Sequence, residues 1–152
     1  DVSGKGIEAA SMSALVKTAL TAYAWEDAGP ARMARSLNSM LMGFSRVETF
    51  VTAFIAKIDL KAGRATYCSA GHPPTMVIRP ESMPLGGGEA RGGEVELLGC
   101  QSGVIGAFES MVYETGVFWA SLTDLPNRRW TMTLHWCPLS FYGVVHRRRW
   151  AG

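Results

Sequence analysis

Hydrophobic residues recur at helical spacing along the first third of the chain. Between residues 7 and 25 apolar side chains return every three or four positions, and alanines fill much of the space between them. Gly29-Pro30 then interrupts the chain, and Pro30 suits the first position of a new helix. A second apolar stripe follows, formed by Met33, Leu37, Met40, Leu41 and Phe44. The pattern predicts helices over residues 7–25 and 30–44.

The pattern changes to a strand period after residue 48. Residues 49–59 alternate between two faces that are both mostly apolar, as in a central strand covered on both sides. Residues 59–63 (DLKAG) have the composition of a hairpin turn, and the glycine-rich residues 84–93 are expected to form a surface loop. Further strands are predicted over residues 64–69, 75–79, 94–98 and 111–118.

The order of these elements predicts the fold class. Two helices followed by a run of antiparallel hairpins indicate an α+β fold, in which the helices pack on one face of an antiparallel sheet. The second apolar face of the strand at residues 49–59 also needs a cover. Nothing in the sequence obviously supplies one, so we expect missing material or an unseen partner.

Composition adds the features of a globular domain. Hydrophobic residues make up 47% of the 152 residues and charged residues 18%, and no apolar run is long enough to cross a bilayer. Cys68, Cys100 and Cys137 are odd in number and form no Cys-x-x-Cys, so we interpret them as free thiols in a reducing, cytoplasmic compartment. Cys68 is expected to be buried and inert. The first residue is not Met, which we interpret as a fragment or a processed product.

The charge is distributed unevenly. Residues 1–124 contain ten Lys and Arg against thirteen Asp and Glu, a net charge of −3, whereas residues 125–152 contain five Arg and no acid, a net charge of +5. The same region is rich in tryptophan. This change of composition separates the end of the chain from the rest.

The opening segment, residues 1–6 (DVSGKG), carries the candidate chemistry. The Asp1 carboxylate can hold a hard cation such as Mg²⁺ or Mn²⁺. Glycines let the backbone approach an ion or a phosphate, and the helix N-terminus that follows offers unpaired N–H groups to an anion. These parts suggest a metal-and-phosphate site. The same residues would also serve in an ordinary capped helix start, so the segment alone leaves both interpretations open.

Three segments in this order resemble the SpoIIE-type serine/threonine phosphatases of the metal-dependent (type 2C) protein phosphatase superfamily. They are residues 1–10 (DVSGKGIEAA), 50–54 (FVTAF) and 67–74 (YCSAGHPP), and the similarity continues to about residue 118. The resemblance implies a partial αββα sandwich, a pair of Mn²⁺ or Mg²⁺ ions, and hydrolysis of phosphoserine or phosphothreonine on a protein. In bacterial relatives that phosphoprotein is often an anti-anti-sigma factor.

The resemblance also implies roles for single residues. Asp1 would bridge the two metal ions, and the backbone carbonyl of Val2 would complete one coordination sphere. Lys5 could meet the substrate phosphate, or it could be a solvated lysine. His72 could act as a general acid, but a structural role at a break in the strand is the interpretation we favour. Glu8 is explained by its favourable interaction with the helix dipole.

The sequence departs from the family pattern in its carboxylates. The family has a metal-binding Asp before the segment that begins here at Asp1, and a Thr-Asp-Gly near residue 120. Here Thr123-Asp124 is followed by Leu125, so Asp124 is a remnant that could serve as a second metal ligand. No acid follows it. We therefore expect this chain to be inactive, although its family is enzymatic; the alternative is a non-catalytic phosphatase fold that binds a regulatory partner.

We predict two parts, a phosphatase domain over residues 1–118 and an atypical tail over residues 119–152. The tail has the composition that a shifted reading frame of GC-rich DNA often produces. The competing interpretation is a genuine basic and aromatic tail that binds nucleic acid or an anionic membrane. No nucleic-acid motif accompanies it, so we expect no nucleic-acid partner and no membrane segment.

Overall fold

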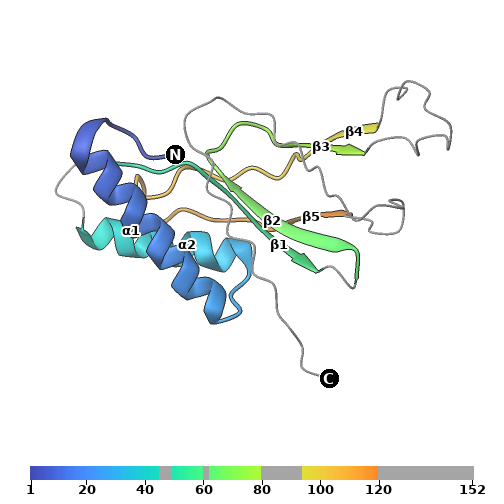
Figure 1. Ribbon diagram of the computed structural model, residues 1–152, viewed down its shortest axis with the longest axis horizontal. Coiled ribbons are helices and arrows are strands. Elements are labelled where there is room, and N and C mark those ends of the chain that lie inside the picture. The colour runs from blue at the N-terminus through green and yellow to red at the C-terminus, as the bar shows by residue number, and fades with distance from the viewer. Residues whose placement is uncertain (45–48, 60–61, 80–93, 120–152) are drawn as a thin grey trace, which may run out of the picture.

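The structure, a computed structural model, describes residues 1–44, 49–59, 62–79 and 94–119. Two helices precede five strands, and both helices lie on the same side of the longest strands (Figure 1). The elements are α1 (Gly6–Trp25), α2 (Pro30–Phe44), β1 (Ala53–Asp59), β2 (Arg64–Ala70), β3 (Met76–Arg79), β4 (Glu94–Leu97) and β5 (Gly116–Trp119). The expected α+β class, with two helices on an antiparallel sheet, is confirmed.

Strand β2 is the middle of a three-stranded antiparallel sheet ordered β1-β2-β5. Cys68 of β2 lies opposite Ile55 of β1, and Ala65 of β2 lies opposite Phe118 of β5. Strands β3 and β4 pair separately in a two-stranded sheet. The expected run of successive hairpins is therefore wrong after β2, whose second neighbour is the distant β5. The two prolines after β2 lack backbone N–H groups, which disfavours an unbroken continuation of the ladder.

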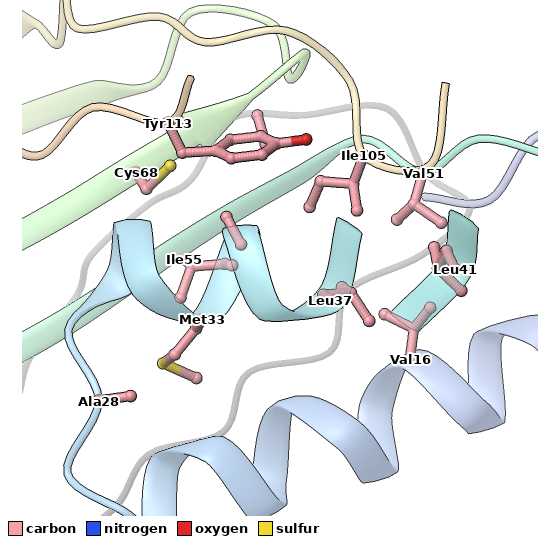
Figure 2. Packing of buried hydrophobic residues seen from close by; sticks show 12 residues of the cluster. Val16, Ala28, Met33, Leu37, Leu41, Val51, Ile55, Cys68, Ile105 and Tyr113 are labelled. Carbon is pink, nitrogen blue, oxygen red and sulfur yellow. The ribbon is translucent and has the colours of Figure 1, made fainter. Parts of the chain in front are cut away.

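The main core lies between the helices and one face of this sheet. Leu37 is fully buried, and Figure 2 shows it below Ile105 and Val51 and above Val16 of α1. Ile55 and Cys68 supply the sheet side of the same core. The buried face of α2 is formed by Met33, Ala34, Leu37, Asn38 and Leu41, with Pro30 at its start. Of the predicted apolar stripe, Met33, Leu37 and Leu41 are buried. Met40 is half-buried, and Phe44 at the end of the helix is 65% exposed, so the stripe is wrong at Phe44.

A second, smaller core covers the opposite face of the sheet. It contains Ala65, Tyr67, Leu98 and Phe118, with Val77 and Cys100 packed against them. The expectation that nothing in the chain covers this face is therefore wrong. The cover comes from Val77 of β3 and from Leu98 and Cys100 after β4. It is partial, because Ile58 of β1 stays 39% exposed.

Two element boundaries also differ from the prediction. The strand expected over residues 49–59 starts at Ala53, because Val51 makes isolated bridges to Val2 and Ile105 instead of continuing the β1–β2 ladder. The strand expected over residues 111–118 is confined to β5. The loop at residues 84–93 and residues 120–152 of the tail lie outside the described residues. No described helix is long and apolar enough to span a membrane.

Truncation of Leu37 tests the main core. Because this side chain is 0% exposed, Leu37→Ala should lower the free energy of unfolding by about 2–5 kcal/mol through lost burial and a residual cavity. Ile7→Ala is the matched control, since Ile7 is 83% exposed and its loss should change stability by less than about 0.5 kcal/mol. Urea unfolding followed by circular dichroism measures both. Equal losses would contradict this description of the core.

Candidate functional site

The segment predicted to carry the chemistry is an extended stretch that pairs through an isolated bridge beside the sheet. The Asp1 amino nitrogen donates to the Thr52 carbonyl at 2.7 Å, and the Thr52 N–H donates back to the Asp1 carbonyl at 2.8 Å. Two residues on, the Ser3 N–H donates to the Phe50 carbonyl at 2.9 Å, and Ser3 Oγ accepts from the Phe50 N–H at 2.9 Å. Residues 1–3 are thus fixed to residues 50–52 at both ends.

This pairing determines the direction of the Val2 carbonyl. Val2 lies opposite Val51 in an antiparallel bridge, between the two hydrogen-bonded pairs. In such a non-hydrogen-bonded pair the N–H and C=O of both residues point away from the partner strand. Val51 uses its outward groups on Ile105, with both N–H···O distances at 2.8 Å. The Val2 carbonyl points to the opposite side and has no hydrogen-bond partner among the described residues.

The Asp1 side chain is exposed and has no ion pair or hydrogen bond within the described part of the chain. It does not cap α1. The residue at the N-cap position is Lys5, in an extended conformation and without a side-chain cap hydrogen bond. The capping interpretation of Asp1 is therefore wrong. A free carboxylate and an outward carbonyl on adjacent residues are the two groups to which the family resemblance gives a role in metal binding.

A glycine turn connects this stretch to α1. Gly4 has φ +106° and Gly6 has φ +77°, a left-handed conformation that residues with a side chain rarely adopt. Lys5 between them is exposed, as is Glu8 in the first turn of α1. The turn leads from Asp1 and Val2 into the N-terminal end of the helix, and the predicted roles of Asp1, Val2 and Lys5 stay predictions.

His72 lies at the same end of the sheet. Ala53 bridges Gly71 and directly follows Thr52, the partner of Asp1. The His72 ring is half-buried, with Nδ1 2.9 Å from the Pro73 carbonyl oxygen and the ring centroid 6.3 Å from that of Phe54. These contacts suit the structural role at the strand break, and a general-acid role stays an untested prediction.

The close packing around position 71 explains why a glycine stands there. Its φ is +63°, and a Cβ atom there would lie 2.3 Å from Cγ1 of Val104, closer than two carbon atoms can approach. The Gly71 N–H donates to the Ser102 carbonyl at 2.8 Å, which ties the end of β2 to the segment after β4. The glycine therefore lets two backbones meet beside the candidate site.

Substitution of Gly71 tests this close approach. Gly71→Ala should destabilise the chain by more than about 1 kcal/mol, because it combines a positive φ with a steric clash. Gly99→Ala is the control, since its φ lies outside that region and a Cβ there meets no atom within 4 Å. Thermal or urea unfolding of the two variants gives the comparison. A stability loss at Gly71 no larger than at Gly99 would refute the steric argument.

A polar network that sequence reasoning missed lies behind this rim. Asn38 of α2 is 2% exposed, and its Oδ1 accepts from the Gly106 N–H at 2.7 Å. Tyr113 places its hydroxyl 3.1 Å from the same oxygen, and burial raises the pKa of Tyr113 to about 12. The signal was available, because a lone asparagine on the apolar face of a predicted helix needs buried partners.

The thiol of Cys68 is fully buried, as expected. Burial is the main cause that raises its pKa to about 11 from the ordinary 9.0, against a smaller opposing effect of the Ser102 side chain. A raised pKa keeps the thiol neutral, and a neutral thiol is a poor nucleophile. Cys68 is therefore part of the core and not of the chemistry.

These two shifts predict alkaline destabilisation. Both groups bind their protons more tightly in the folded chain, so their stabilising contribution is complete below about pH 9 and is lost as the pH rises through about 11 for Cys68 and about 12 for Tyr113. Urea unfolding at a series of pH values from 8 to beyond 11 should show the decline, and Cys68→Ala should make it shallower. A free energy of unfolding that is flat across this range would contradict it.

The described residues meet only part of the requirement of a divalent-metal centre. Asp1 and Val2 offer two oxygens, but no group of three or more His, Cys, Asp or Glu residues within the described ranges could hold an ion. Asp124, the other predicted ligand, lies outside these ranges. A pair of cations needs further carboxylates, so Asp1 and Val2 fit as a fraction of such a site and not as the whole.

Comparisons with known proteins agree with the resemblance. A family model described as stage II sporulation protein E (SpoIIE) matches residues 1–119, which is most of the chain. The phosphoserine phosphatase RsbU of Bacillus subtilis (strain 168) is 29% identical over 92 residues, which cover 60% of this chain. The same match covers 28% of RsbU, so the chain spans less than a third of that relative.

Proposed function

Because this chain belongs to the SpoIIE family of phosphatases, we propose that it serves in the hydrolysis of phosphoserine or phosphothreonine on a protein, with a pair of Mn²⁺ or Mg²⁺ ions. The substrate we propose is an anti-anti-sigma type of regulator in the bacterial cytoplasm. The relative RsbU is itself named a phosphoserine phosphatase. The observation that carries the proposal is the family match over residues 1–119, which begins at the free Asp1 carboxylate.

Asp1 and Val2 are the residues proposed to hold the metal. Their oxygens lie on consecutive residues of a strand that is hydrogen-bonded at both ends, so the backbone carbonyl is oriented before any ion binds. Bound divalent cations would neutralise phosphoryl oxygens. They would also lower the pKa of a bound water toward neutral, so that it can act as a nucleophile. Lys5, in the glycine turn, is proposed to attract the substrate phosphate.

The chain of 152 residues is proposed to be inactive on its own. Among the residues that the structure describes, Asp1 is the single carboxylate assigned to the ions, and one carboxylate with one carbonyl is too few for two cations. The remaining ligands would have to come from Asp124 or from sequence beyond this chain. Domain boundaries at residue 118 and an atypical tail after it stay predictions.

Metal binding by the opening segment can be measured directly. Addition of Mn²⁺ to ¹⁵N-labelled protein should broaden the amide signals of Val2 and Ser3 before those of β3 and β4. Asp1→Asn should remove this selectivity by taking away the carboxylate charge. Glu8→Gln is the matched control, because Glu8 is an exposed carboxylate nearby in the first turn of α1. Broadening that is unchanged in Asp1→Asn, or lost equally in Glu8→Gln, would refute the assignment.

Hydrolysis is tested with a phosphoprotein and a chromogenic phosphate ester in the presence of Mn²⁺. We expect no release of phosphate above background by this chain, and robust turnover would show the predicted inactivity to be wrong. In a longer, active product of the same gene, Asp1→Asn should lower kcat/KM by more than about 100-fold. Retention of activity in that variant would contradict the role of Asp1.

The rival function, a non-catalytic binding module, is distinguished by the gene. An Asp codon upstream of Asp1 and a reading frame that restores Thr-Asp-Gly at residues 123–125 would favour the enzyme. A complete gene with this same start and tail would favour the binding module.

A further inference from the structure

We propose that Asn38 is a positioning residue for Asp1, because it holds the loop at residues 104–108 on which the Asp1 strand depends. The inference rests on the proposed function in one respect, since the position of Asp1 has a chemical purpose only if Asp1 binds metal. The physical linkage itself is independent of that function.

Asn38 uses both ends of its side-chain amide on this loop. Its Oδ1 accepts from the Gly106 N–H at 2.7 Å, and its Nδ2 donates to the Phe108 carbonyl at 3.0 Å. The two hydrogen bonds hold the loop backbone at positions two residues apart. They therefore fix both the distance between the loop and α2 and the orientation of the loop. An apolar side chain of the same size could fill the space but could not orient the loop.

Tyr113 completes the attachment from the other side. Its hydroxyl oxygen lies 3.1 Å from Asn38 Oδ1 and 3.0 Å from the Val104 carbonyl oxygen. The Tyr113 side chain is 3% exposed, and Figure 2 shows Cys68 beside the start of the side chain and the hydroxyl on the side of Ile105. Asn38 and Tyr113 together bind the loop at Val104, Gly106 and Phe108, on both sides of Ile105.

Ile105 transmits this constraint to the candidate site. Its N–H and C=O both pair with Val51 at 2.8 Å, and Val51 in turn lies opposite Val2. Three segments therefore lie side by side at the rim of the sheet, joined by backbone hydrogen bonds: residues 1–3, residues 50–52 and Ile105. We call this arrangement the ribbon. In this ribbon Ile105 is the inner edge and Asp1 is on the outer strand, so release of the loop removes the support of the strand that holds Asp1.

The linkage predicts a local effect in addition to a general loss of stability. Asn38→Leu removes one partner of each hydrogen bond, and a buried polar group left without its partner costs about 1–3 kcal/mol. This cost affects the ribbon and the β1–β2 ladder alike. The ribbon in addition loses the attachment that keeps it closed.

Native-state hydrogen exchange tests this proposal without any metal. In Asn38→Leu the amides of Ser3, Val51, Thr52 and Ile105 should exchange about tenfold faster relative to amides of the β1–β2 ladder. Tyr113→Phe removes a single hydroxyl from the same network and should move the same amides in the same direction by a smaller factor. If Asn38→Leu does not fold, Tyr113→Phe alone tests the proposal.

Two controls separate positioning from ordinary stability. Leu37→Ala, one residue before Asn38, should accelerate ribbon and ladder amides together, because it weakens the shared core. Thr75→Val removes another buried polar group, whose Oγ1 has no hydrogen-bond partner in the described residues, and should leave the ribbon unchanged. If Asn38→Leu resembles either control, with ribbon and ladder affected alike or the ribbon unaffected, the proposal is overturned.

Failure of the proposed function gives a different result. If Mn²⁺ does not selectively broaden Val2 and Ser3 in the unmodified chain, the metal role of Asp1 is wrong, while the exchange data still decide the linkage. If both hold, Asn38→Leu should raise the Mn²⁺ concentration at half-maximal broadening by about tenfold, since an open ribbon must close before it binds. An unchanged midpoint together with faster ribbon exchange would overturn the positioning of Asp1 by Asn38.

Discussion

The fold depends on the burial of β2 on all sides. This strand is paired along both edges, by β1 and by β5, and four consecutive residues at its end, Tyr67 to Ala70, are buried. Backbone groups that leave water must find partners, and apolar side chains on two faces need two covers. The helices supply one cover, while Leu98 and Val77 supply the other. The other described elements are arranged so that β2 is hydrogen-bonded on both edges and covered on both faces.

The segment between β4 and β5 connects the centre of the sheet to the residues that pair with the Asp1 segment. Tyr67 accepts the Cys100 N–H at its hydroxyl, Ser102 pairs with the end of β2, and Ile105 pairs with Val51. One stretch of irregular backbone thus touches both cores and the ribbon that carries Asp1. Backbone hydrogen bonds and side-chain caps replace the ladder that a regular strand would provide, which explains how a segment without strand pattern is held in one place.

The parts of the fold that were predictable are those governed by local periodicity. The helices at residues 7–25 and 30–44 and the hairpin of β1 and β2 follow from the spacing of apolar residues and from a turn sequence, and motif resemblance identified the family. Pairing of β2 with β5 and the cover from Leu98 are long-range choices that no local pattern encodes. Asn38 shows the same limit, because the sequence marks it as a polar residue on an apolar face but does not identify its distant partners.

Strand register is part of the chemistry wherever a backbone oxygen is the ligand. The outward direction of the Val2 carbonyl follows from its place between two hydrogen-bonded pairs, and its side chain contributes nothing to that direction. The Val2 side chain has a separate role, because it packs against the main core and must stay apolar to keep that contact. Insertion or deletion of a single residue in the opening segment would exchange inward and outward groups. The length of this segment is therefore constrained by the carbonyl, and its composition at Val2 by the core.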